Sequence, residues 1–206
     1  MVEFQRKDFY SYEDFLEIMR LLRAPGGCPW DREQTHSSIR RNFLEETYEV
    51  LDAIDHDDAH GMCEELGDVL MQVAFHAQIE AERGRFTMAD VVNGVAQKLV
   101  YRHPHVFGDV QADTSQQVLN NWEVLKRREK GQRSTADAVE SVPHTLPALW
   151  RAEKIQSKTA KAGFDWESAL QALDKLEEEV RELRAALEAG QAADVPHGIR
   201  EEVGDA

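Results

Sequence analysis

Residues 62–79 constrain the fold more strongly than any other part of the sequence. Apolar side chains recur at helical spacing around almost the whole circumference of this stretch, namely Met62, Cys63, Leu66, Val69, Leu70, Met71, Val73, Ala74, Phe75, Ala77 and Ile79. A helix that is apolar on every side is normally buried inside a protein. The sequence therefore predicts a buried helix around which the other elements pack.

Three polar residues interrupt this apolar surface along one narrow stripe. Glu65, Asp68 and Gln72 stand at positions i, i+3 and i+7 and so share one face of the helix. A buried carboxylate is costly unless it is protonated, paired with a cation or bound to a metal. The two acids on this stripe therefore need a partner.

The preceding helix, predicted over residues 31–55, offers more acids instead of a cation. Glu46 and Glu49 lie along the margin of its apolar face, and no Lys or Arg is found where the two helices would meet. An antiparallel hairpin would gather these acids with Glu65 and Asp68, and four carboxylates without His or Cys suit Mg²⁺, with Mn²⁺ as a second possibility. The alternative is a solvated acidic surface on a non-catalytic helical binding protein.

The rest of the chain also follows helical periodicity, and no stretch alternates in the way that strands do. Asp31 and Gln34 have the spacing of a capping box, and Thr87 precedes another helix as a predicted N-cap. The polar stretch 131–141 is typical of a linker. We therefore expect an all-α protein, with further helices over residues 12–22, 59–83, 88–102, 115–130 and 165–189 and one directly after Pro147.

Charge and cysteine content exclude several classes of partner. The 24 Lys and Arg face 39 Asp and Glu, and a net charge of −15 repels nucleic acid polymers and anionic membranes. A triphosphate would need a metal ion and a few well-placed cations to bind such a protein. The chain has two cysteines without CxxC spacing, which predicts a cytoplasmic protein. It has no apolar run long enough to span a membrane.

The acid pattern occurs twice in the chain. Residues 45–49 and 64–68 recur as residues 178–182 and 201–205, which implies two copies of one helical hairpin. We expect a first module over residues 1–133, a linker over 134–146 and a second module over 147–206 that is truncated, in a protein that naturally continues. A second, incomplete metal site would then consist of Glu179, Glu182, Glu202 and Asp205, and turnover is expected from the first module alone.

Several cations and aromatic residues are candidates for holding a phosphorylated ligand. Lys98 and Arg102 are four residues apart on one helical face, and Trp122 stands one turn before Lys126. Spacing alone is equally compatible with solvated faces. Trp30 is a further candidate, although packing at the start of a helix is the simpler role for it.

Taken together, the motifs resemble those of the MazG family over nearly the whole chain. They are residues 27–36 (GCPWDREQTH), the EExxE and EExxD acids, residues 98–107 (KLVYRHPHVF) and residues 163–166 (GFDW). The resemblance implies tandem all-α modules, each completed by homodimerisation, that hydrolyse a nucleoside triphosphate to a monophosphate and pyrophosphate. A relative of narrower range, such as a dUTP or phosphoribosyl-ATP pyrophosphohydrolase, remains an alternative.

The resemblance also implies roles for individual residues. Mg²⁺ is expected on Glu46, Glu49, Glu65 and Asp68, with Glu46 or Glu49 as the base that assists the attacking water. The nucleotide is expected on Asn42, Lys98, Arg102 and Trp122, with Trp30, Lys126 and Lys175 as further candidates. Asn42 departs from the pattern, because the matching position of the second copy is Lys175 and a cation is what the resemblance implies there.

Overall fold

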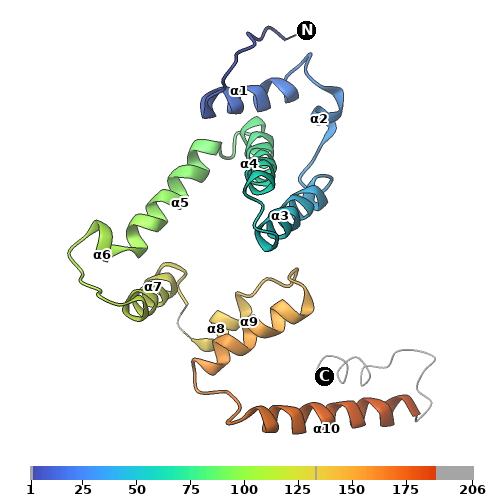
Figure 1. Cartoon of the computed structure of the whole chain (residues 1–206), viewed down its shortest axis with the longest axis vertical. Coiled ribbons are helices and arrows are strands. Elements are labelled where there is room, and N and C mark those ends of the chain that lie inside the picture. Colours follow the sequence, from blue (N-terminus) through green and yellow to red (C-terminus); the bar gives the residue numbers. More distant parts are fainter. Residues whose placement is uncertain (1, 133, 189–206) are drawn as a thin grey trace. The chain divides into compact units, whose positions relative to one another are not determined.

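The computed structural model describes residues 2–132 and 134–188, and every regular element in this part of the chain is a helix, as predicted (Figure 1). The chain divides into two compact units, Met1–Val118 and Leu119–Ala206, which are described separately. None of the helices in the described residues is both long and apolar enough to cross a membrane.

The first unit is built around a hairpin of two helices. It contains α1 (Tyr12–Arg23), α2 (Pro29–Glu33), α3 (Arg40–Asp55), α4 (Ala59–Glu82), α5 (Met88–Arg102) and α6 (Pro104–Phe107), and α3 packs along α4. Asp58 caps the start of α4, where its carboxylate accepts hydrogen bonds from the backbone N–H groups of His60 and Gly61 at 3.1 and 3.0 Å. The short turn before this cap makes the hairpin antiparallel.

The prediction of one continuous helix over residues 31–55 is wrong. The capping box of Asp31 and Gln34 does not form, because the Gln34 amide donates instead to the backbone oxygen of Trp30 at 2.9 Å. Thr35 and Ser38 then bond reciprocally, each hydroxyl accepting from the other's backbone N–H. These bonds stabilise a turn between α2 and α3, so the acid-bearing helix begins only at Arg40.

The helix over residues 59–82 is buried along its second half only, which corrects the expectation of burial throughout. The core of the first unit contains Met19, Ile39, Ala74, Phe75 and Ile79, with Phe15, Leu16, Leu22 and Met71 packed against it. In the first half of α4, by contrast, Leu66 is 51% exposed and Leu70 is 40% exposed. Within the described residues, these two side chains thus remain largely uncovered.

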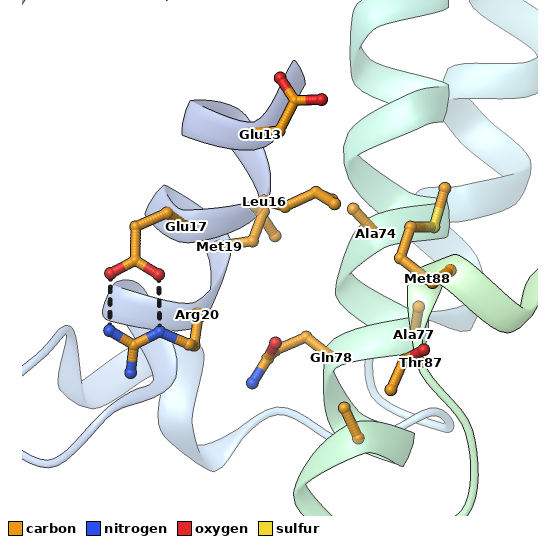
Figure 2. Close-up of a pocket in the computed structure, with 12 residues that line it drawn as sticks. Glu13, Leu16, Glu17, Met19, Arg20, Ala74, Ala77, Gln78, Thr87 and Met88 are labelled. Atoms are coloured by element: carbon orange, nitrogen blue, oxygen red, sulfur yellow. Dashed lines mark hydrogen bonds and ion pairs between the residues drawn. The ribbon is translucent and has the colours of Figure 1, made fainter. Parts of the chain in front are cut away.

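An arginine fixes α1 against the buried half of α4. The Arg23 guanidinium donates two hydrogen bonds to the Glu82 carboxylate, at 2.8 and 2.9 Å, and lies over the Phe75 ring at 5.2 Å from its centroid. Between α1, α4 and the start of α5 lies a largely apolar groove of about 400 Å³, with the Glu17–Arg20 ion pair at its rim (Figure 2).

The second unit is also helical, and α7 (Ser115–Glu129) runs across the boundary between the units. It is followed by α8 (Thr135–Glu140), α9 (Ala148–Ala160) and α10 (Ala169–Glu188). The polar stretch 131–141, predicted to be a linker, instead contains α8, because Ser134 and Asp137 form a capping box at its start and Ala138 is buried. The predicted module boundaries stay predictions.

Candidate metal centre

Three carboxylates meet where α3 and α4 lie side by side. Glu46 and Glu49 come from successive turns of α3, and Glu65 comes from the first half of α4. Each of them offers an oxygen, and the three oxygens lie within 4.8 Å of one another. The antiparallel hairpin therefore brings together acids that are far apart in the sequence, as its acidic stripes predicted.

The fourth predicted ligand, Asp68, lies outside this group of three oxygens. It stands one turn after Glu65 on α4, and its negative charge helps to raise the pKa values of both Glu46 and Glu65. Asp68 is thus close enough to act on the cluster electrostatically. Its role as a direct metal ligand stays a prediction.

Crowding of like charges perturbs the cluster. Burial, followed by a hydrogen bond shared with Glu49 and by the charge of Asp68, raises the pKa of Glu46 above its usual value. Burial and the charge of Glu49 likewise raise the pKa of Glu65. Among residues 2–132 and 134–188, no Lys or Arg forms an ion pair with any of the four acids. A cation would relieve this repulsion.

The chemistry and shape of the cluster fit a divalent metal ion. All the donors are hard carboxylate oxygens, which Mg²⁺ and Mn²⁺ prefer over nitrogen or sulfur. The cluster borders an open groove of about 330 Å³, lined by Glu49, Asp52, Ala53, His56, Asp58, Gly61 and Glu65. Ligands from outside could therefore reach the carboxylates.

The predicted nucleotide-binding residues of the first unit are distributed over two helices. Asn42 lies half-buried in the first turn of α3, one turn before Glu46. Lys98 and Arg102 lie near the end of α5, where Lys98 is exposed and Arg102 is buried. Among the described hydrogen bonds and ion pairs, none joins Lys98 to the acids, so its contact with a ligand stays a prediction.

The predicted aromatic residues are divided between the two units. Trp122 belongs to the second unit, where the Lys126 ammonium lies 4.5 Å from the centroid of its ring. Trp30, on α2, is 59% exposed, so most of its side chain does not pack at the start of the helix as expected. The roles of these three residues toward a nucleotide also stay predictions.

The second set of acids has a different environment in its described part. Glu179 on α10 is buried and pairs with the Lys175 ammonium at 2.7 Å, while Glu178 lies 3.1 Å from the same ammonium. These hydrogen bonds raise the pKa of Lys175. Glu182 is exposed, and Glu202 and Asp205 lie outside the described residues.

Sequence reasoning missed a polar cluster at the other end of the α3–α4 hairpin. The Nδ1 atoms of His36 and His76 are 2.7 Å apart, and the stacked ring of His36 also reaches Glu80 through its Nε2. Glu80 is further paired with Arg83 and Arg85. The spacing of His76 and Glu80 at i and i+4 was visible in the sequence, but His36 joins them only through the turn before α3.

Comparison of the sequence with those of known proteins places the chain in a family. A sequence model of the MazG nucleotide pyrophosphohydrolase domain matches residues 34–107, which include α3, α4 and all four acids. The nucleoside triphosphate pyrophosphohydrolase of Escherichia coli K12 is 47% identical over 191 residues, covering 92% of this chain and 72% of that protein. The chain belongs to the MazG family.

Two other relatives extend the comparison. The MazG nucleoside triphosphate pyrophosphohydrolase/pyrophosphatase of Thermotoga maritima is 44% identical over 194 residues, covering 94% of this chain and 71% of that protein. The uncharacterized protein YabN of Bacillus subtilis is 50% identical over 148 residues, covering 72% of this chain but only 30% of its own length. The MazG likeness therefore extends through both units of the chain.

Proposed function

We propose that this MazG-family chain hydrolyses nucleoside triphosphates to nucleoside monophosphate and pyrophosphate, with Mg²⁺ held by Glu46, Glu49, Glu65 and Asp68. The observation that carries the proposal is the meeting of three carboxylate oxygens within 4.8 Å on the α3–α4 hairpin. The names of the Escherichia coli and Thermotoga maritima relatives support the reaction.

The carboxylates offer two of the functions that this reaction requires. A bound Mg²⁺ would polarise a phosphate oxygen and offset the charge of the phosphate chain. The Glu46 carboxylate would accept a proton from the attacking water, with Glu49 as the alternative base. Glu49, which shares a hydrogen bond with Glu46, would orient that carboxylate.

The test is pyrophosphate release from a panel of nucleoside triphosphates, with Mg²⁺ and with EDTA. Glu65→Gln and Asp68→Asn remove charge at nearly constant volume and should each abolish Mg²⁺-dependent turnover while helicity is retained. Glu64→Gln is the matched control, because Glu64 is an exposed neighbour on the same helix, and it should retain activity within about twofold. Full activity in both site variants would refute the proposed site.

We further propose that a second copy of the chain covers the exposed half of the α3–α4 hairpin. Leu44 and Tyr48 on α3 are 55% and 47% exposed, close to the values for Leu66 and Leu70 on α4. So many large apolar side chains on one hairpin are typical of an interface. The hairpin carries the carboxylates, so dimerisation would also enclose the candidate metal centre.

Light scattering after size-exclusion chromatography tests the dimer. Leu66→Glu combined with Leu70→Glu should give a monomer, because charges would be placed on the covered face. Leu149→Glu introduces the same charge at a residue that is 85% exposed in the second unit and should leave the mass unchanged. A monomeric wild-type protein at micromolar concentration would contradict the proposal.

A further inference from the structure

The polar cluster at the turn before α3 contains two histidines that share one hydrogen bond. The Nδ1 atoms of His36 and His76 lie 2.7 Å apart, and the planes of the two rings differ by only 9°. His36 belongs to the turn between α2 and α3, whereas His76 lies in the buried half of α4. Two nitrogens at this separation have room for one hydrogen between them. The bond therefore joins the turn to α4 only while one of the two Nδ1 atoms carries no proton.

Glu80 decides which nitrogen of His36 carries a hydrogen. The Glu80 side chain is buried and accepts hydrogen bonds from Arg83 and Arg85, at 3.2 and 2.6 Å. These two cations keep the carboxylate ionised, and an ionised carboxylate can only accept, so the Nε2–H of His36 donates to it at 2.5 Å. In the neutral pair, the Nδ1 atom of His36 is therefore the acceptor, and the Nδ1–H of His76 is the donor.

The histidine pair can take up one proton, but a second proton must separate the rings. With one added proton, a single hydrogen still lies between the two Nδ1 atoms. With two, both nitrogens carry a hydrogen and both rings are positively charged, so they repel each other at 2.7 Å. Burial and the charge of His36 lower the pKa of His76 below its ordinary value of 6.5, which confines double protonation to acidic pH.

The surroundings of the pair do not offset a second positive charge. On α3, the group that faces His76 is the uncharged ring of Phe43. The charged side chains of α1, α4 and the following loop are already paired with one another, namely Glu80 with Arg83 and Arg85, and Glu82 with Arg23. Among the described residues, His36 is the only group whose charge shifts the pKa of His76. Repulsion within the pair therefore has no relief except separation of the rings.

Separation of the rings would act on the helix that carries two of the metal-centre carboxylates. Phe43 packs edge-on against His76, with 5.9 Å between the ring centroids. Phe43 stands one turn before Glu46 and about two turns before Glu49 on α3. Glu65 lies on α4, roughly 16 Å along the helix from His76. A movement of the start of α3 against α4 would therefore change the separation of Glu46 and Glu49 from Glu65.

We propose that His36 and His76 are positioning residues for the metal centre. Together with Glu80 they form a proton-sensitive latch, which holds the turn before α3 against α4 and opens when both rings are protonated. While the latch is closed, α3 holds its two carboxylates at the distance from Glu65 that Mg²⁺ requires, and opening of the latch weakens Mg²⁺ binding. The effect on Mg²⁺ rests on the proposed metal centre, whereas the latch itself is independent of that proposal.

Histidine NMR tests the latch without metal or nucleotide. In EDTA, the resonances of His76 in the wild-type protein should titrate below pH 6.5. His36→Gln should raise the midpoint of His76, because the neighbouring positive charge is removed. His60→Gln is the matched control, since His60 is an exposed histidine on the same helix, and it should leave the midpoint of His76 unchanged. A wild-type midpoint at or above 6.5, or one that His36→Gln does not raise, would overturn the latch.

Hydrogen exchange measured by mass spectrometry shows whether the turn before α3 opens. After correction for intrinsic rates, the amides of residues 35–43 should exchange about fivefold faster at pH 5.5 than at pH 7.5 in the wild-type protein. His76→Asn supplies an uncharged amide that can donate to His36 or accept from it, so the latch should stay closed and the corrected exchange should be equal at both pH values. Equal acceleration in the two proteins, or none in the wild type, would overturn the latch.

Titration calorimetry with Mg²⁺ tests the positioning role. At pH 7.5, His76→Ala should weaken Mg²⁺ binding by about fivefold or more, whereas His76→Asn and His60→Gln should bind within about twofold of wild type. Between pH 7.5 and pH 5.5, the wild type should lose about fivefold more affinity than His76→Asn, because protonation of the four acids weakens both proteins alike.

The outcomes separate this inference from the proposed function. Equal losses of Mg²⁺ affinity in the wild type and His76→Asn, or full affinity in His76→Ala, would overturn the positioning role. Wild-type protein that binds no Mg²⁺ at pH 7.5 would refute the metal centre instead, and the NMR and exchange measurements would still decide the latch.

Discussion

Replacing Glu46 by Gln is expected to stabilise the metal-free protein while it abolishes catalysis. The change removes one of three carboxylates whose oxygens lie within 4.8 Å of one another, at nearly constant volume. Active sites that crowd like charges are held together by the rest of the fold, so relieving the repulsion should increase the free energy of unfolding.

The magnitude follows from the separation of the charges. Two unit charges 4.8 Å apart repel by about 0.9 kcal/mol in water and by about 3.5 kcal/mol at an effective dielectric constant of 20. Glu46 has two such neighbours, Glu49 and Glu65, but it is only half-buried and its charge is screened by solvent and salt. We therefore expect a total gain of about 1 kcal/mol, or about 3 °C in Tm for a chain of this size.

The direction of the pKa shift of Glu46 decides at which pH values Glu46→Gln stabilises the protein. The pKa of Glu46 is raised in the folded state above its ordinary value of 4.5, so the folded state holds this proton more tightly than the unfolded state. In the wild type, the protonated Glu46 carboxyl group contributes stability below pH 4.5, and this contribution is lost as pH rises through the raised pKa. The stabilising effect of Glu46→Gln should thus appear at pH 7.5 and vanish at pH 4.

Thermal unfolding in EDTA at fixed protein concentration measures the effect. Glu45→Gln is the control, because Glu45 is an exposed neighbour that pairs with Arg41, and its loss should lower stability by less than about 0.5 kcal/mol. Addition of Mg²⁺ should reverse the order, since the wild type binds the ion more tightly than the variant does. A Glu46→Gln variant that is less stable than wild type in EDTA would refute the reasoning.

Three further predictions concern the first unit. Gly27→Ala should lower the free energy of unfolding by at least about 3 kcal/mol in urea titrations, because a Cβ there would overlap the backbone oxygens of Leu21 and Leu22. Arg23→Lys should cost about 1–2 kcal/mol in the same assay, since an ammonium cannot donate the paired hydrogen bonds to Glu82; an unchanged midpoint would contradict this. Burial alone would raise the pKa of Glu80, but hydrogen bonds to His36 and Arg85 outweigh burial and lower the pKa. Ionised Glu80 therefore stabilises the fold above pH 4.5, and this contribution is lost as pH falls through the lowered pKa. Glu80→Gln should remove the same contribution. A Tm difference that is the same at pH 7 and pH 3 would argue against this role.

Helical periodicity and capping residues were sufficient to predict most of the elements. The bounds expected for the helices over residues 12–22, 59–83 and 88–102 differ from the observed ones by at most one residue, because apolar spacing and N-caps such as Thr87 act locally. The break before Arg40 was missed, because the capping-box spacing of Asp31 and Gln34 predicted a helix start there. The reciprocal hydrogen bonds of Thr35 and Ser38 instead stabilise a turn after Gln34. The helix over Thr135–Glu140 was missed, because its polar composition resembled a linker.

The sequence by itself determined the acidic character of the site, because residues three and four apart must share one face of a helix. It therefore predicted Glu46, Glu49, Glu65 and Asp68 as one group before their separation in space was known. Only tertiary structure decided that oxygens of the three glutamates meet within 4.8 Å while Asp68 lies outside these three. It also decided which half of α4 is buried and that Lys161, at the end of α9, pairs with Glu123 on α7. These features depend on the packing of helices that are distant in the chain, and helical spacing carries no information about that packing.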